Sequence, residues 1–178
     1  GAPLTRVMTQ VNFLLLIIAG NETTRNALSG GIQALWEHAE QLARLRRDPS
    51  LLPQAIEEIL RWVSPVMQFR RTALRDTKIG NREIRKGEKV VMYYGAANRD
   101  PEVFENPETF DITRRPNPHL AFGVGTHFCM GSHIARLEMR VTLEEFLRRF
   151  PDVSLAGPPE RAPSNFISSI QHLPLNLA

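Results

Sequence analysis

The sequence has little of what marks several large classes of protein. Its 178 residues include one cysteine, which excludes a scaffold of internal disulfides and is typical of a reducing compartment, so we expect a cytoplasmic protein. The longest apolar run, residues 13–19, is too short to cross a bilayer. The formal net charge is only +3, and no basic run is interleaved with aromatic residues, so we expect no nucleic-acid partner.

The pattern of apolar residues, glycines and prolines predicts a mainly α fold with small peripheral β-sheets. Helical periodicity and terminal signals predict helices over residues 4–37, 39–48, 51–64 and 132–150. Alternating segments between turn residues predict short strands over residues 69–73, 77–79, 83–84 and 89–94. We expect an irregular loop over residues 100–118, and loops with short strands over residues 152–178.

The single cysteine lies in a glycine-rich loop that leads directly into a predicted helix. Cys129 follows Gly123 and Gly125 and precedes Gly131. Glycines let a loop bend so that its backbone N–H groups converge on a sulfur, and the helix start adds a positive partial charge. Both effects favour the thiolate. An exposed thiolate is easily oxidised, so we expect a metal partner, and a single thiolate suits axial ligation of a haem iron.

Zinc is the alternative metal for this loop. His127, Cys129 and His133 offer three ligands of the types that zinc accepts. Structural zinc sites usually have four protein ligands, and the sequence has no second cysteine. Haem is therefore the favoured interpretation.

Three motifs, in this order along the chain, resemble those of the cytochrome P450 family. They are Ala-Gly-x-Glu-Thr at residues 19–23, Glu-x-x-Arg at residues 58–61, and Phe-x-x-Gly-x-His-x-Cys-x-Gly at residues 122–131. The resemblance is to soluble bacterial members. It implies the carboxy-terminal half of the P450 fold, with distal helix, Glu-x-x-Arg helix, meander, cysteine loop and following helix. Residues 1–178 are thus expected to be a partial P450 domain that lacks the amino-terminal half.

The first motif is a poor helix sequence, since a glycine such as Gly20 costs about 1 kcal/mol in a helix interior. A kinked core helix with a solvated Glu22 is one interpretation. The resemblance implies another, in which Ala19 and Gly20 leave room beside the cofactor for O₂ and substrate. Thr23 would then hydrogen-bond the dioxygen while Glu22 relays protons from solvent, which makes this pair catalytic. We expect Thr24 to satisfy its own hydroxyl within the helix.

The resemblance also implies which residues hold the cofactor, haem b. Cys129 is the expected axial ligand of the iron, in the loop that ends at Gly131. Arg71 and His127 match the family positions whose cations meet the haem propionates. Phe122 is expected to pack beside the loop and shield the sulfur.

The Glu-x-x-Arg motif places an acid and a base on one helical face. From spacing alone, Glu58 and Arg61 are most simply a solvated surface pair. The resemblance implies instead a buried structural triad with Arg114, which pins the loop that precedes Cys129. Buried charges of this kind require charge-assisted partners.

Apolar residues near the expected distal pocket predict a hydrophobic substrate, such as a sterol, a terpenoid or another lipid, although each residue could equally fill the core. They are Leu15, Ile18, Val66, Met67, Phe69, Phe166 and Ile167.

The implied activity is that of a haem-thiolate monooxygenase, which inserts one oxygen atom of O₂ into a hydrophobic organic substrate. The sequence has no flavin or nicotinamide fingerprint, so electrons are expected from a ferredoxin and ferredoxin reductase or an equivalent donor. Arg136, two helical turns after Cys129, is expected to dock that donor, with a solvated helix arginine as the alternative. Two other activities stay open: a haem-binding but catalytically incompetent fragment, and a P450-type peroxygenase, against which Glu22 and Thr23 argue.

Overall fold

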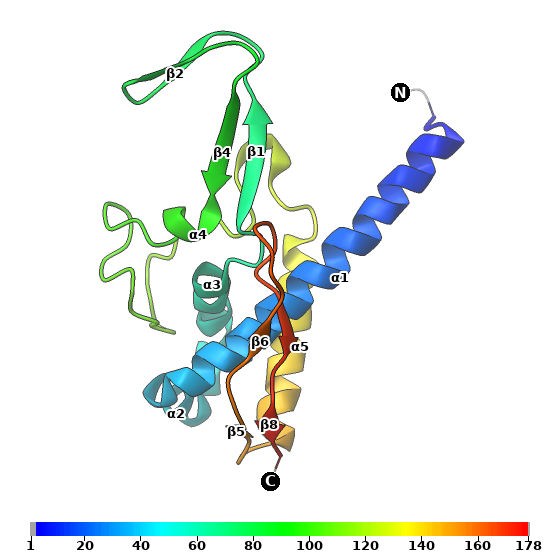
Figure 1. The fold of residues 1–178 in the computed structure, drawn as a ribbon. Helices are drawn as coiled ribbons and strands as arrows, with labels where there is room; N and C mark the ends of the chain where they lie inside the picture. The colour runs from blue at the N-terminus through cyan, green and yellow to red at the C-terminus, as the bar shows by residue number, and fades with distance from the viewer. Residues whose placement is uncertain (1–2, 178) are drawn as a thin grey trace.

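The structure, a computed structural model, describes residues 3–177 and is mainly helical, as the sequence predicts. Four long helices and one short one follow the chain (Figure 1): α1 Arg6–Glu37, α2 Ala39–Arg47, α3 Leu52–Val63, α4 Tyr94–Ala97 and α5 Ser132–Arg149. Two 3₁₀ turns accompany them, η1 Pro49–Leu51 and η2 Gly125–His127. The short helix α4 was not predicted, because its Tyr-Gly-Ala-Ala sequence is too short to show a period.

The β-structure consists of small antiparallel pairs at the edge of the helical body. The pairs are β1 Gln68–Thr72 with β4 Lys89–Tyr93, β2 Thr77–Ile79 with β3 Arg82–Ile84, β5 Ser154–Leu155 with β8 Leu175–Asn176, and β6 Glu160–Arg161 with β7 Ile170–His172. The β1–β4 ribbon extends from the body and carries the β2–β3 hairpin at its far end (Figure 1). The register places Phe69 opposite Met92.

The core lies where α1 crosses α3 and α5. Ile59 of α3 and Met139 and Leu143 of α5 are fully buried there. Gly30 and Gly31 of α1 allow this crossing, because a Cβ added at Gly31 would lie only 2.7 Å from Cγ2 of Ile59. The glycine pair, an unfavourable choice in a helix interior, is thus explained by close helix packing.

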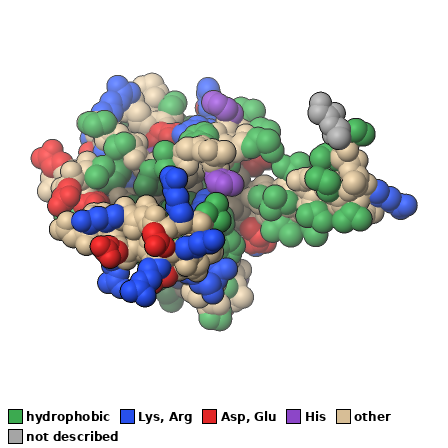
Figure 2. All heavy atoms as spheres, turned by 90° about the horizontal axis from the view of Figure 1, so that it is seen from above, with side chains coloured by type: hydrophobic (Ala, Val, Ile, Leu, Met, Phe, Trp, Pro, Cys, Tyr) green, Lys and Arg blue, Asp and Glu red, His purple; other side chains and the backbone are tan. Residues whose placement is uncertain are grey.

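The first half of α1 projects away from this core (Figure 1). Apolar side chains cover the projecting segment in Figure 2, and those of Phe13, Leu14 and Ile17 are more than half exposed. Within residues 3–177, no helix is both long and apolar enough to span a membrane.

Candidate functional site

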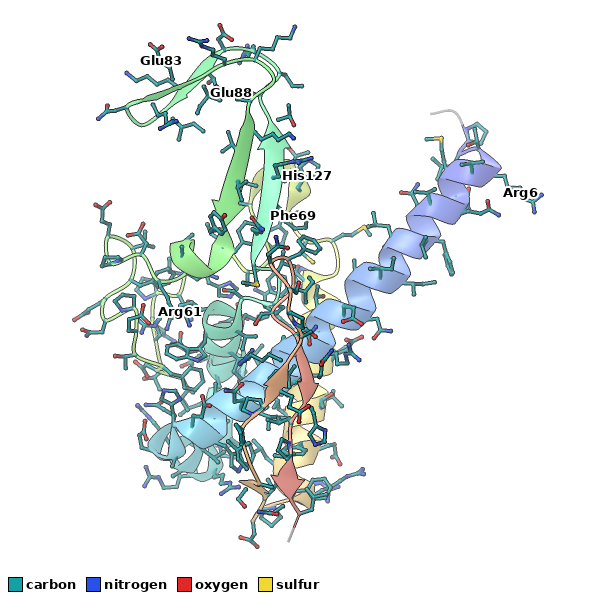
Figure 3. The ribbon with its side chains drawn as sticks, viewed as in Figure 1. Arg6, Arg61, Phe69, Glu83, Glu88 and His127 are labelled. Atoms are coloured by element: carbon teal, nitrogen blue, oxygen red, sulfur yellow. The ribbon has the colours of Figure 1, made fainter. Side chains whose placement is uncertain are left out.

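Glu58, Arg61 and Arg114 come together as one buried charged cluster. Arg61 donates to both carboxylate oxygens of Glu58, from Nη2 to Oε1 at 2.7 Å and from Nε to Oε2 at 2.8 Å. Arg114 Nε adds a bond to Oε2 at 3.2 Å. The side chains of Glu58 and Arg61 are 0% exposed. The alternative of a solvated surface pair is therefore wrong for Glu58 and Arg61. Figure 3 labels Arg61 on α3.

The two arginines of this cluster also bind backbone carbonyls of the segment 98–114. Arg61 Nη1 donates to the carbonyls of Asn98 at 2.8 Å and Pro107 at 2.9 Å. Arg114 Nη2 donates to the carbonyl of Thr109 at 2.8 Å. A segment with almost no regular secondary structure is thus held against α3 by charge-assisted hydrogen bonds.

Two asparagines, of which Asn98 is buried, complete the link between the triad and the cysteine loop. Asn98 is fully buried; its Nδ2 donates to Ser64 Oγ at 2.8 Å, and its Oδ1 accepts from the backbone N–H of Leu120 at 2.7 Å. Asn117 Nδ2 donates to Glu58 Oε2 at 3.1 Å. Sequence reasoning missed both, because an asparagine in an irregular loop has no periodic signal.

The cysteine loop is shaped by two glycines with left-handed backbone angles, Gly123 at φ +69° and Gly125 at φ +72°. The backbone N–H of Cys129 donates to the carbonyl of Phe122 at 2.9 Å, which closes the loop. Cys129 is partly exposed and unbridged. Gly131 directly precedes α5 with an ordinary φ of −85°, and a Cβ there would meet no atom within 4 Å. Its backbone therefore does not require glycine.

On the distal helix, the Ala-Gly-x-Glu-Thr motif lies inside the continuous helix α1. Thr23 Oγ1 donates to the carbonyl of Ala19 at 2.6 Å. Glu22 accepts two bonds of 2.9 Å from Arg25. A Cβ at Gly20 would meet nothing within 4 Å, so this face of the helix is open.

The prediction for Thr24 is wrong, because the helix bond it was expected to make belongs to Thr23. Thr24 makes no side-chain hydrogen bond within residues 3–177. Its side chain is buried.

The two cations expected to meet carboxylates are on separate elements. Arg71 lies on β1, where its Cζ is 6.0 Å from the centroid of the Phe69 ring and its Nη1 donates to the carbonyl of Arg70 at 3.1 Å. His127 is exposed at the end of η2. In the part of the chain that the structure describes, neither side chain forms an ion pair, so both are free to bind an anion.

Five of the predicted substrate residues form one apolar cluster at the start of β1. Val66 forms a bridge with Ile167, and the backbone N–H of Met67 donates to the carbonyl of Phe166 at 2.8 Å. The rings of Phe69 and Phe166 meet edge to face with centroids 5.5 Å apart. Figure 3 shows Phe69 at the base of the β1–β4 ribbon.

The other two predicted substrate residues are in the projecting half of α1. Leu15 and Ile18 are largely exposed there. They share the helix with the Ala-Gly-x-Glu-Thr motif.

Arg136 is paired within the chain rather than simply solvated, and its docking of an electron donor stays a prediction. Its Nε and Nη2 donate to the two carboxylate oxygens of Glu57 at 2.6 and 2.8 Å. His119 lies 3.0 Å from the same carboxylate. Burial raises the pKa of Glu57, but the hydrogen bonds from Arg136 and His119 and the charge of Arg136 outweigh burial and lower it to about 2. The guanidinium is thus already occupied by a partner within the chain.

The structure does not assemble the alternative zinc site. Among the described side chains, no three of His, Cys, Asp or Glu lie close enough together to hold a metal ion. His127, Cys129 and His133 therefore do not form a ligand set here.

The residues present fit a haem with one axial sulfur. Cys129 offers one accessible thiol, and exposed apolar side chains, Val124, Phe128 and Met130, lie on the same loop. Space without neighbouring atoms adjoins both Gly20 on the distal helix and Gly131 at the loop. A flat apolar cofactor with anionic groups requires such a surface, and Arg71 supplies a cation at its expected margin.

Comparison with known proteins agrees with this architecture. A family model described as Cytochrome P450 matches residues 48–169. Cytochrome P450 126 of Mycobacterium tuberculosis is 53% identical over 165 residues, which are 93% of this chain and 40% of that protein. A steroid C26-monooxygenase of Mycolicibacterium smegmatis is 48% identical over 164 residues, which are 91% of this chain and 41% of that protein.

Solved structures have the same fold. CYP109E1 from Bacillus megaterium, in complex with testosterone, superimposes with a TM-score of 0.95 at 39% identity, over 99% of this chain and 50% of that one.

A helical fold with a glycine-bounded cysteine loop tied to a buried Glu-x-x-Arg cluster defines a P450-type protein. The chain belongs to the cytochrome P450 family. It spans about 40% of the length of the curated relatives it matches. The family and fold predicted from the sequence are confirmed.

Proposed function

We propose that this chain is part of a haem-thiolate monooxygenase that inserts one oxygen atom of O₂ into a hydrophobic organic substrate. The observation that carries the proposal is the loop around Cys129, which is closed by its own backbone hydrogen bond to Phe122 and connected through Asn98 to the Ser64 end of α3. Relatives in the family are monooxygenases. Haem b, when bound, would supply the redox chemistry that activates O₂.

The chain's own groups have distinct roles in this proposal. Cys129 would hold the iron through its sulfur, and Arg71 and His127 would meet the propionates. Thr23 donates its hydroxyl hydrogen to Ala19, so its oxygen keeps lone pairs that can accept a hydrogen bond from a water or a substrate oxygen. Glu22 is half-exposed one residue before it, in a position to exchange protons with solvent.

The substrate class follows from the apolar surface at Val66, Met67, Phe69, Phe166 and Ile167. This surface offers little to a polar ligand, and steroids and related lipids match it chemically. A relative named as a steroid monooxygenase and a P450 structure with bound testosterone support the same class. We infer a sterol, terpenoid or lipid substrate. Electrons are proposed to come from a ferredoxin and its reductase or an equivalent donor. The cytoplasmic location stays a prediction.

The test is the absorption spectrum of the reduced, CO-bound protein after loading with haem. The parent chain is expected to show the Soret position of thiolate ligation, and Cys129→Ser to lose it. Cys129→His is the matched replacement, expected to give a histidine-type spectrum. A thiolate spectrum in Cys129→Ala would refute the ligand assignment, because the chain has no other cysteine.

Two alternatives give different results in turnover assays. A catalytically incompetent fragment would bind haem and CO but form no product with any oxidant. A peroxygenase would form product with hydrogen peroxide alone. The proposed monooxygenase requires O₂ and an electron donor, and its product formation depends on Glu22 and Thr23.

A further inference from the structure

A second charged cluster lies beside the triad, on the neighbouring residue of α3. Glu57 binds Arg136 of α5 through two hydrogen bonds of 2.6 and 2.8 Å and His119 through one of 3.0 Å. Glu57 and Arg136 are both about one-third exposed, so the pair is partly shielded from water. Bidentate pairing of this kind fixes the plane of the guanidinium as well as its position.

His119 is fixed in one tautomer by its two neighbours. Its side chain is only 3% exposed. The backbone N–H of Ala121 lies 3.3 Å from Nδ1 and can only donate, so Nδ1 accepts. The ring proton is therefore on Nε2, where it donates to Glu57. His119 thus binds Oε2 of Glu57, the oxygen that also accepts from Arg136 Nη2, and it does so from the segment that leads into the cysteine loop.

Arg136 in turn reaches the cysteine loop through Phe122. Its Cζ lies 4.5 Å from the centroid of the Phe122 ring, a cation–π contact. The carbonyl of Phe122 accepts the backbone N–H of Cys129 at 2.9 Å. The hydrogen bonds that Arg136 donates to Glu57 raise the pKa of Arg136, burial lowers it, and the negative charge of Glu57 raises it further. The guanidinium therefore packs on the ring of the residue whose carbonyl closes the cysteine loop.

We propose that Arg136 is a positioning residue, held by Glu57 and His119, that keeps Phe122 in place and maintains a fixed positive charge beside the loop of Cys129. This charge draws electron density from the sulfur and so sets how strongly the thiolate donates to a bound metal. Glu57 has two effects, because it fixes the guanidinium and offsets part of its charge. The inference rests on the proposed haem-thiolate function, which it deepens.

The opposite charges of the two partners provide the test in the haem-loaded protein. Arg136→Gln removes a positive charge and is expected to lower the haem reduction potential. Glu57→Gln keeps an oxygen that can accept from the guanidinium but removes the negative charge, so it is expected to raise the potential. Each substitution should change the equilibrium constant of haem reduction on the order of tenfold. For a one-electron reduction this is a change of about 59 mV in the potential. Arg136→Lys keeps the positive charge, so its haem reduction potential should stay nearer to that of the parent.

The matched control is Arg140→Gln, one turn further along α5. Arg140 is 59% exposed and pairs only with Glu144 of its own helix, so its replacement should leave the potential unchanged. A merely structural role predicts that Arg136→Gln and Glu57→Gln shift the potential in the same direction. That result, or a shift in Arg140→Gln as large as in Arg136→Gln, would overturn the inference.

A haem-free measurement separates this inference from the proposed function. Cys129 is the one cysteine of the chain, so its rate of alkylation by iodoacetamide reports thiolate reactivity directly. Without haem, Arg136→Gln should react more slowly than the parent and Glu57→Gln faster. Absence of a thiolate CO spectrum in the parent would refute the proposed function, and equal alkylation rates in all variants would refute the role of Arg136.

Discussion

Replacement of Glu58 by glutamine tests how much the buried triad contributes to stability. The carboxylate accepts hydrogen bonds from Arg61 at 2.7 and 2.8 Å, Arg114 at 3.2 Å, Asn117 at 3.1 Å and the backbone N–H of Asp111 at 2.9 Å. An amide turns one acceptor oxygen into a donor that faces other donors. It also leaves two buried guanidinium groups without a counter-charge.

Loss of one partner from a buried ion pair costs about 3–5 kcal/mol. A whole domain has a free energy of unfolding of only about 5–15 kcal/mol. With a urea dependence of about 2 kcal/mol per molar, Glu58→Gln should lower the urea midpoint by about 1.5–2.5 M. Glu58→Asp, which keeps the charge but shortens the side chain, should fall between the parent and Glu58→Gln.

The assay is urea unfolding followed by far-ultraviolet circular dichroism, with Glu57→Gln as the matched control. Glu57 is the preceding residue of α3 and carries the same charge, but it is partly exposed, so its loss should cost about 1 kcal/mol or less. If Glu58→Gln had the same midpoint as Glu57→Gln, the triad could not be the main attachment of the loop to α3.

Three further outcomes are expected. Gly31→Ala should destabilise the protein despite the better helix propensity of alanine, because the new Cβ would lie 2.7 Å from the stiff, β-branched Ile59; a higher thermal midpoint would contradict this. Thr23→Ala should divert electrons to hydrogen peroxide, measured as product formed per reductant consumed, while Thr23→Ser should stay coupled; equal coupling in all three proteins would end the proton-delivery role. Because the pKa of Glu57 is lowered, its contribution to stability is complete above pH 4.5 and is lost as the pH falls toward 2. Between these pH values, the urea midpoint of Glu57→Gln should therefore decline less than that of the parent.

The sequence predicted the parts of the site that depend on local pattern. The long helices follow from periodicity, and the pairing of Glu58 with Arg61 follows from their spacing on one helical face, with which the structure agrees. Gly123 and Gly125 have the positive φ angles that a sharp loop predicts.

What the sequence could not show depends on contacts between distant segments. Glu57 and Arg136 are 79 residues apart, and nothing local indicates that they meet. Asn98 joins α3 to the cysteine loop through buried bonds to residues 34 and 22 positions away. Such pairs arise only when the helices pack, because packing decides which faces of α3 and α5 oppose one another.

Because α1 crosses α3 at the glycine pair, a small tilt of α1 at this crossing would displace the projecting half of the helix by a larger distance. Sixteen residues separate Gly31 from Leu15, which is about 24 Å along a helix that rises 1.5 Å per residue. A tilt of about 5° at this pivot would move the far end by roughly 2 Å, and Glu22 and Thr23 by proportionally less. Bulk added at the pivot would therefore change the width available to a substrate between this helix and the cysteine loop. Selectivity in such a protein would depend on side chains that never touch the molecule being selected.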